Sequence, residues 1–469
     1  MKARLLRLAD RLRQSYWFLP SVMACAAILL AGGMIWLDSY EGSVWMDRFA
    51  WLRASRPSGA RQLLSAIGGS MITVAGTVFS VTIAAVVYAS GQYGPRLLSN
   101  FMRDRGNQVT LGTFIATFLY CLIVLRTVRS PEESGGVGFV PNIALLVAVL
   151  LALCSIAVLI FFIHHVPSKI HINNVIEDVG KRLLREVGHR FPRFLGEPAD
   201  RGRQTGDTIV PEPFRQGGEA EAAAPVRLVT ASHTGYIQLV RDEDLLQLAS
   251  RHDLVLRLRY QPGDFVHAGR ALILVFPAER CDEEASQALA DAFAIGSQRT
   301  ALQDLRFLID ELVEIAARAL SPGINDPFTA ITCLDWLGAA MSDLSGREIP
   351  FHLRQDADGA LRVIAHPQRF GDFLERSFGS LAQYCAGDRV AALHFLSSLG
   401  EVAVACEDRE RLAAVRTHID RIAGLAGSKL DRLNSQVVTD RANLLRDALA
   451  KPDHRRRLRD DFSWLGGAA

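Results

Sequence analysis

Four long runs without a charged residue lie in the N-terminal part of the chain, at residues 16–37, 62–89, 109–125 and 137–163. A helix needs roughly 17–25 apolar residues to cross the hydrocarbon layer of a membrane, and each run reaches that length. The second run has twenty-eight residues from Gln62 to Ala89, which make about 42 Å of helix and exceed the layer's ~30 Å thickness. We therefore predict a transmembrane domain of four helices at residues 16–167.

The second run carries a stripe of small and hydroxyl residues. At about 100° per residue, five of them share one narrow sector of the helix: Ser65, Gly69, Thr73, Gly76 and Ser80. Small residues allow close packing with a neighbouring helix, which is the first hypothesis for this stripe. The second hypothesis is that the stripe contacts water and lines a pore or solute path in an oligomer. The pattern is compatible with both.

Basic residues mark the expected cytoplasmic side. They occur at the N-terminus, in the loop after the second run and in the segment after His165. Because cytoplasmic segments of membrane proteins are enriched in Lys and Arg, we expect both termini in the cytoplasm. Several arginines in the first loop make this bias modest. Residues 1–15 are basic and amphipathic, which is typical of a helix lying at the membrane surface.

After the fourth run the pattern changes to that of an α+β region. We predict a juxtamembrane helix at 168–195, a flexible linker rich in Gly, Pro, Glu and Ala at 196–225, a small β-rich subdomain at 226–277, a helical domain at 278–450 and a basic tail at 451–469. The predicted fold class is a membrane α-helical protein with a cytoplasmic α+β region, which combines a barrel-like subdomain with a helical bundle.

The β-rich subdomain contains a turn, Gln261 to Gly269, that resembles the turns of biotinyl- and lipoyl-type half-barrels. Such carriers attach their cofactor to a lysine, and no lysine occurs between Arg182 and Ser428. We therefore expect a structural barrel without a covalently attached cofactor. Further along, Phe351–Pro367 predicts a β-hairpin.

A distinctive turn lies within the helical domain. One helix ends near Leu320 and the next begins at Pro327, with Asp326 in the N-cap position. The residues of this structural motif are Ser321, Pro322, Gly323, Asn325, Asp326 and Pro327. A catalytic or metal-binding role for this turn, together with Asp310 and Glu314, is the alternative. Capping already explains the aspartate, so we favour the structural role.

Composition and motifs exclude several classes of protein. The chain has 469 residues and a formal net charge of only +2, so it has no basic footprint for nucleic acid. Its seven cysteines are scattered without a CxxC pair, which indicates reduced, structural thiols. His164, His165 and His171 lack ligand-spaced partners and fit a membrane interface better than a metal site. No nucleophile elbow or phosphate-binding loop occurs, and we expect no enzymatic activity, cofactor or metal.

Four motifs resemble those of a known family: GTVFSVT at Gly76–Thr82, SGQYGPRLL at Ser90–Leu98, GYIQ at Gly235–Gln238 and ALSPGINDPFTA at Ala319–Ala330. On these motifs the chain is similar, over nearly its whole length, to a bacterial family of predicted membrane proteins with a domain of unknown function. The resemblance implies a four-span inner-membrane protein with a cytoplasmic C-terminal region and brings no known activity. The layout also looks loosely like that of bestrophin channels, without a shared motif.

Two functional hypotheses follow. The first is a homo-oligomeric channel or solute conduit of the bacterial inner membrane, lined by the stripe and assembled or gated by the cytoplasmic region. No acidic or basic residue interrupts the second run, which disfavours proton-coupled transport. The alternative is a membrane-anchored signalling or scaffold protein without transport activity. The expected partners are the lipid bilayer, further copies of the chain, and an unidentified solute or cytoplasmic protein, with no nucleic acid.

Overall fold

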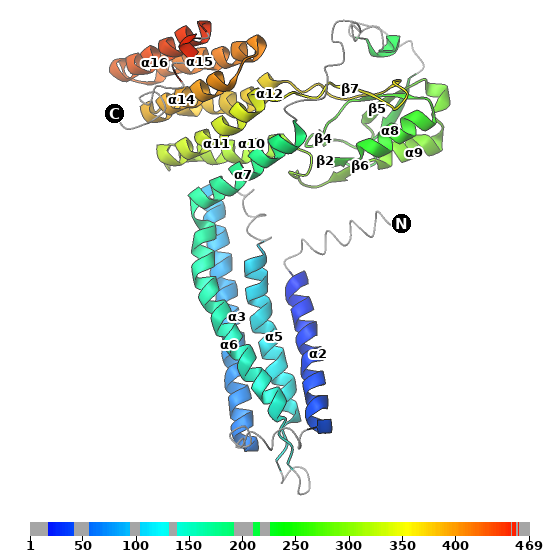
Figure 1. The fold of residues 1–469 in the computed structure, drawn as a ribbon, viewed down its shortest axis with the longest axis vertical. Helices are drawn as coiled ribbons and strands as arrows, with labels where there is room; N and C mark the ends of the chain where they lie inside the picture. The colour runs from blue at the N-terminus through cyan, green and yellow to red at the C-terminus, as the bar shows by residue number, and fades with distance from the viewer. Residues whose placement is uncertain are drawn as a thin grey trace. The chain divides into compact units, whose positions relative to one another are not determined.

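The computed structural model describes residues 17–41, 56–93, 104–130, 138–191, 210–215, 226–451, 453–455 and 458. The chain divides into two compact units, Met1–Val175 and Ile176–Ala469 (Figure 1). The amphipathic N-terminus predicted at 1–15 lies outside the described residues. So do most of the linker predicted at 196–225 and most of the tail predicted at 451–469.

Four long helices make up the first unit: α2 (Phe18–Glu41), α3 (Pro57–Tyr93), α5 (Arg105–Thr127) and α6 (Asn142–Ile170). All four are long and apolar enough to cross a membrane, which confirms the prediction of four apolar helices. Half of the apolar window of α5 is buried, more than in any of the other three. This helix packs against α2, α3 and α6, and Figure 1 shows it between α2 and the pair formed by α3 and α6.

Close backbone approach and buried hydrogen bonds hold these helices together. A Cβ on Gly112 of α5 would lie 3.2 Å from Cα of Pro20 in α2, so a larger residue would push the two helices slightly apart. The fully buried Tyr120 donates its hydroxyl to the carbonyl of Ala144 in α6 at 3.0 Å. Because the membrane interior holds no water, polar groups there need such protein partners.

Two further polar contacts link distant parts of the first unit. The hydroxyls of Thr117 and Ser155 lie 3.0 Å apart between α5 and α6. The buried carboxylate of Asp38, near the end of α2, accepts hydrogen bonds from the amides of Ile143 and Ala144 at 3.0 and 2.9 Å. These amides belong to the first turn of α6, which has no carbonyl partners of its own. Asp38 therefore caps a helix more than a hundred residues away in the chain.

The second unit contains two small sheets. The five-stranded sheet has the order β1 (Arg227–Thr230), β5 (Ala271–Phe276), β3 (Val255–Leu258), β8 (Leu361–Ile364) and β7 (Leu353–Gln355). The three-stranded sheet has the order β4 (Phe265–Val266), β2 (Gly235–Val240) and β6 (Phe293–Gly296). All described pairings are antiparallel except that of β3 with β8.

The sheets differ from the predicted half-barrel. The strands from 226–277 are divided between the two sheets and pair with later strands, so a separate barrel-like subdomain is not confirmed. The predicted hairpin is confirmed, because β7 and β8 form an antiparallel pair. Helices α8 (Asp242–Arg251) and α9 (Glu283–Asp291) pack beside the strands through Leu245 and Leu289.

The remaining helices form a layer of their own: α7 (Ile172–Arg190), α10 (Leu305–Ala319), α11 (Pro327–Ser345), α12 (Phe370–Leu374), the π-helical turn η7 (Glu375–Gly379), α13 (Ser380–Cys385), α14 (Arg389–Ala405), α15 (Arg409–Lys429) and α16 (Arg432–Ala450). Short 3₁₀ turns, η4 (Glu212–Phe214) and η6 (Ala278–Arg280), complete the described elements. The amphipathic α7 buries Val179 and Leu183, and its Gly180 lies directly against Trp336 of α11.

Candidate functional site

The stripe predicted in the second run lies on α3 and points away from the other described helices. Its five residues, Ser65, Gly69, Thr73, Gly76 and Ser80, are all exposed. A Cβ added to Gly69 or Gly76 would meet no atom within 4 Å. The helix packs instead through a different face that buries Leu64, Met71, Ala75 and Val78. Packing against the described helices of the same unit is therefore not the role of this stripe.

The hydroxyl groups of the stripe bond within their own helix. Thr73 donates to the carbonyl of Gly69 at 2.9 Å, and Ser80 donates to that of Gly76 at 2.9 Å. Thr77, which follows Gly76 but is not part of the stripe, donates to the carbonyl of Thr73 at 3.1 Å. Such bonds satisfy the hydroxyl hydrogen while leaving oxygen lone pairs on the helix surface. The arrangement presents an uncharged row of acceptors to whatever covers α3.

The turn at residues 321–327 has the geometry of a helix cap. Asp326 accepts hydrogen bonds from the amides of Phe328 and Thr329, both at 3.2 Å, and its own amide donates to Ala319 at 2.8 Å. Asn325 has a φ of 49°, which asparagine tolerates better than most residues. Asp326 thus serves as the N-cap of α11, with Pro327 as the first helical residue.

Asp310, one of the two further acids considered with this turn, is engaged elsewhere. Arg376 contacts its two carboxylate oxygens at 2.6 and 2.7 Å, and Arg299 contacts it at 2.5 Å. Burial alone would raise the pKa of the Asp310 carboxyl, but hydrogen bonds from Arg376 and Arg299 outweigh it and hold this pKa below its ordinary value. Among the described residues, no group of three His, Cys, Asp or Glu side chains is placed to hold a metal ion.

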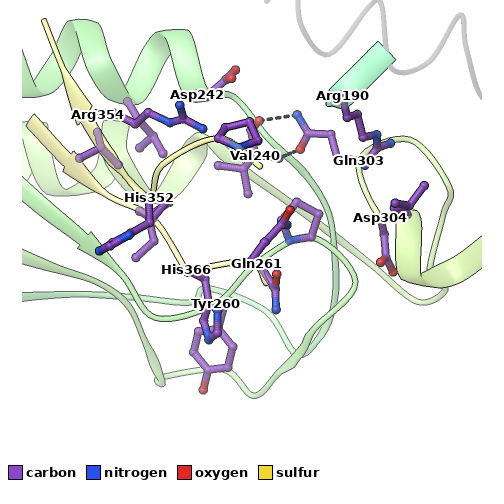
Figure 2. A pocket seen from close by; sticks show the side chains of 18 of the residues that line it. Arg190, Val240, Asp242, Tyr260, Gln261, Gln303, Asp304, His352, Arg354 and His366 are labelled. Carbon is purple, nitrogen blue, oxygen red and sulfur yellow. Dashed lines mark hydrogen bonds between the residues drawn. The ribbon is translucent and has the colours of Figure 1, made fainter. Parts of the chain in front are cut away.

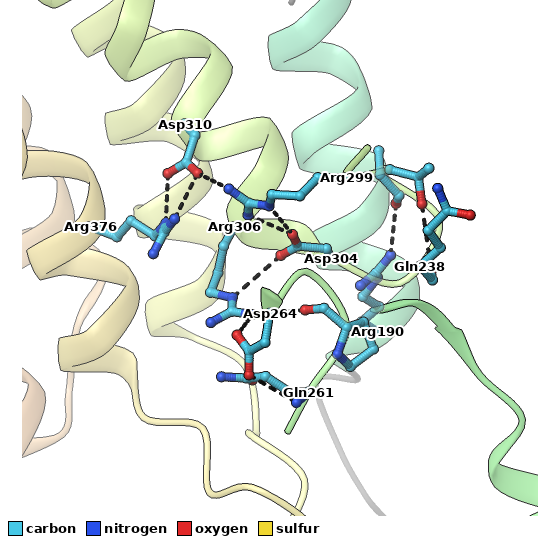
Figure 3. A network of polar contacts seen from close by, with 12 residues as sticks. Arg190, Gln238, Gln261, Asp264, Arg299, Asp304, Arg306, Asp310 and Arg376 are labelled. Atoms are coloured by element: carbon cyan, nitrogen blue, oxygen red, sulfur yellow. Dashed lines mark hydrogen bonds and ion pairs between the residues drawn. The ribbon is translucent and has the colours of Figure 1, made fainter. Parts of the chain in front are cut away.

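The contacts of Asp310 belong to an ionic network in the second unit (Figure 3). Arg299 also binds Asp304 at 2.5 Å, and Arg306 bridges Asp304 to Asp264 at 3.3 and 2.9 Å. Asp304 is only 2% exposed. The two arginines compensate the charge of this carboxylate, because an unpaired buried charge is strongly destabilising. Gly263, at a φ of 93°, has no side chain that would overlap this carboxylate.

A cavity of about 690 Å³ lies beside the network. Figure 2 shows Tyr260, His352 and His366 around it. One wall is fixed by Gln303, whose amide exchanges two hydrogen bonds with the backbone of Val240 at 2.7 and 2.9 Å. The lining mixes leucine side chains with charged and histidine groups. Its volume suits a small ligand.

The electrostatics of the cavity favour a neutral histidine. Partial burial, followed by the positive charges of Arg354 and Arg369, lowers the pKa of His352 below its ordinary value. Arg190, also in the lining, is engaged by Glu186 at 2.9 Å and by the carbonyl of Leu302 at 2.8 Å.

Sequence reasoning found the stripe and the cap but missed the network and the cavity. Arg299, Asp304 and Asp310 are close in sequence, yet Arg376 lies 66 residues beyond Asp310. A local pattern therefore had no means to indicate the network. The cavity lining comes from residues between Glu186 and Phe373, drawn from helices, strands and loops.

Four apolar helices followed by an α+β region define a multi-pass membrane protein. The chain belongs to the family described as predicted membrane protein (DUF2254), which matches residues 13–401. It is also similar to uncharacterised proteins of Mycobacterium bovis and Mycobacterium tuberculosis, each 32% identical over 415 residues. These matches cover 87% of this chain and 76% of each relative. No solved structure matches the chain.

Proposed function

We propose that this membrane protein is a homo-oligomeric conduit for a small solute in the bacterial inner membrane, with both termini in the cytoplasm. The observation that supports the proposal is the outward stripe on α3, whose glycines face open space and whose hydroxyls present acceptors. Copies arranged with α3 at the centre bring these rows together around a common axis. The second unit assembles or gates the conduit, and the proposal assigns no enzymatic activity to the chain.

Such a row differs from the exposed surfaces of the neighbouring helices. The exposed surfaces of α2 and α6 carry large apolar side chains, including Leu29, Leu153 and Ile160, which suit lipid contact. Glycine, serine and threonine are instead enriched where membrane helices approach each other or line a polar path. The absence of charge in the stripe favours a neutral or weakly selective path over proton coupling.

A second candidate is a membrane-anchored signalling or scaffold protein without transport activity. The 690 Å³ cavity of the second unit favours it, because a ligand site in that unit serves sensing as well as gating. On this hypothesis the stripe is a dry contact between copies.

Cysteine accessibility along α3 separates the two. Only two of the seven native cysteines, Cys25 and Cys154, are exposed, so a background with both changed to alanine is sufficient. Single cysteines then replace Ser65, Thr73 and Ser80. As controls, cysteine replaces the buried Val78 and the exposed Val81 on another face. A membrane-impermeant thiol reagent reacts only where water allows thiolate to form.

We expect labelling at the three stripe positions and none at the two valine positions. In liposomes, we then expect a solute flux that labelling of the stripe blocks. Silence at every stripe position, with efficient disulfide cross-linking between copies there, contradicts the conduit and supports dry packing. If the stripe positions show neither labelling nor cross-linking, the stripe neither lines a conduit nor forms a contact between copies.

A further inference from the structure

Two helices of the second unit, α7 and α11, run in the same direction. A Cβ on Gly180 of α7 would overlap the ring of Trp336 in α11. Eight residues later, a Cβ on Gly188 would lie 3.5 Å from the guanidinium of Arg347, which follows α11 and donates to the carbonyl of Phe191 at 2.8 Å. Later residues of α7 thus contact later residues of α11, as expected for two parallel helices. The beginning of α11 therefore lies at the end of the unit where α7 enters it.

Helix α14 begins at this same end. His394 contacts Asp335 of α11 at 2.6 Å, and Ser398, one turn later, lies 3.2 Å from the Cβ position of Gly338. The order of these contacts is again the same along both helices. The turn between α13 and α14 is thus beside the turn that precedes α11.

Helix α15 runs the opposite way, and α16 returns. Arg411, in the first turn of α15, donates to the carbonyl of Ser345 at the far end of α11 at 2.7 Å. Arg446 of α16 binds Asp420 of α15 at 2.6 Å, as expected for an antiparallel pair. The turn between α15 and α16 therefore also lies where α7 enters. We call the three turns, residues 321–328, 384–390 and 429–433, the entry end.

The entry end exposes apolar side chains from all three turns. Leu433 is 81% and Phe328 71% exposed, and the others are Ile324, Tyr384 and Val390. Scattered single apolar residues are ordinary on a protein surface, whereas five in three turns at one end of the unit are the arrangement expected of an interaction surface.

Basic side chains accompany this group. Arg389, Lys429 and Arg432 are exposed in the same turns. Three aspartates are also present, but each is the N-cap of the helix that follows and accepts hydrogen bonds from its first amides: Asp326, Asp388 and Asp431. The positive ends of α11, α14 and α16 compensate these carboxylates. The three basic groups keep their positive charge, with Lys429 also donating to the carbonyl of Gln383, and this charge attracts an anionic partner.

The chain itself brings a bilayer within reach. Helix α6 ends at Ile170, and α7 begins at Ile172 and enters the second unit at Ile176. By helical rise, Phe328 lies about 12 Å before Trp336, as Ile172 does before Gly180. We propose that the entry end is a membrane-contacting surface, in which Ile324, Phe328 and Leu433 insert into the lipid interface and the three basic side chains contact anionic headgroups.

The test uses the full chain in nanodiscs of phosphatidylcholine, with or without phosphatidylglycerol. In the background lacking Cys25 and Cys154, an environment-sensitive fluorophore is attached to Phe328→Cys or to Phe351→Cys. Phe351 is a matched control, since it is 62% exposed and lies beyond the opposite end of α11. Doxyl-labelled lipid then quenches only a fluorophore that contacts the bilayer. Ile324→Cys provides a second labelled position in the same turn.

We expect quenching at 328 and 324 to be several-fold stronger than at 351. Phosphatidylglycerol should increase it, and Arg389→Gln with Arg432→Gln should reduce that increase by more than half, since Lys429 remains, whereas Arg409→Gln at the far end of the unit should not reduce it. Equally weak quenching at all three labelled positions overturns the proposal. Blue-shifted emission at 328 without lipid quenching also overturns it, in favour of contact with a second copy.

Discussion

Capping aspartates determine where the main helices of the second unit begin. Asp326, Asp388 and Asp431 each precede a helix and accept hydrogen bonds from its first-turn amides. These amides have no partner within the helix, so a side-chain acceptor stabilises the helix start by about 1 kcal/mol. Because a cap depends only on neighbouring residues, the local sequence is sufficient to predict it, as it was for Asp326.

The first prediction concerns this cap. Asp326→Ala should lower the free energy of unfolding by about 1 kcal/mol, whereas Asp326→Ser, which keeps an oxygen acceptor, should lower it by only a few tenths. Urea unfolding of the full chain in detergent, followed by circular dichroism, measures both. If serine were as damaging as alanine while the fold stayed intact, the carboxylate would have a role beyond capping.

At the scale of elements, it is easier to predict which residues share a helix face than to predict what packs against that face. Periodicity placed Ser65, Thr73 and Ser80 on one face of α3, and the structure has all three exposed. Which helix, lipid or copy covers a face depends on residues far away in the chain, so the pattern left packing and water contact open. The same limit applies to Gly180 of α7. Its neighbour Trp336 lies in α11, and six strands separate the two helices along the chain.

The contact of α7 with α11 gives the second prediction. Gly180→Ala should destabilise the second unit by about 1–3 kcal/mol, because the added methyl overlaps Trp336 and the helices must separate. Gly188→Ala is the matched control on the same helix: its methyl finds ordinary contact, so the gain in helix propensity should stabilise by about 0.5–1 kcal/mol. Urea unfolding compares the two, and equal effects would contradict the overlap.

At the scale of the whole molecule, the ionic network joins segments that are far apart in the sequence. Asp264 lies in the loop before β4, Asp304 and Asp310 flank the start of α10, and Arg376 lies in η7 (Figure 3). The sheets and the helical layer of the second unit are thus connected by charge as well as by apolar contacts. The fold class was predictable from runs and periods, whereas this connection required the tertiary structure.

The network gives the third prediction. Asp310→Asn should cost about 3 kcal/mol of stability at pH 7, because two arginines lose a half-buried carboxylate. The folded-state pKa of Asp310 is lowered, so its contribution is present above the ordinary value of 3.8 and is lost as pH falls below it. The variant and the parent should therefore converge in stability at acidic pH. Glu177→Gln, at an exposed pair with Lys181, should change little, and a constant difference at every pH would contradict this assignment.

The carboxylate of Asp38 has a consequence for biogenesis. Its two amide partners, Ile143 and Ala144, are synthesised more than a hundred residues after it. Until the ribosome has made the fourth span, the carboxylate at the end of the first span lacks the two amide donors that it binds in the folded protein, which is unfavourable at the edge of the hydrocarbon layer. The first span therefore reaches its final, fully hydrogen-bonded position only after the fourth span has been inserted. A nascent chain that stops before residue 142 exposes an incompletely packed transmembrane domain to the insertion machinery and to membrane proteases.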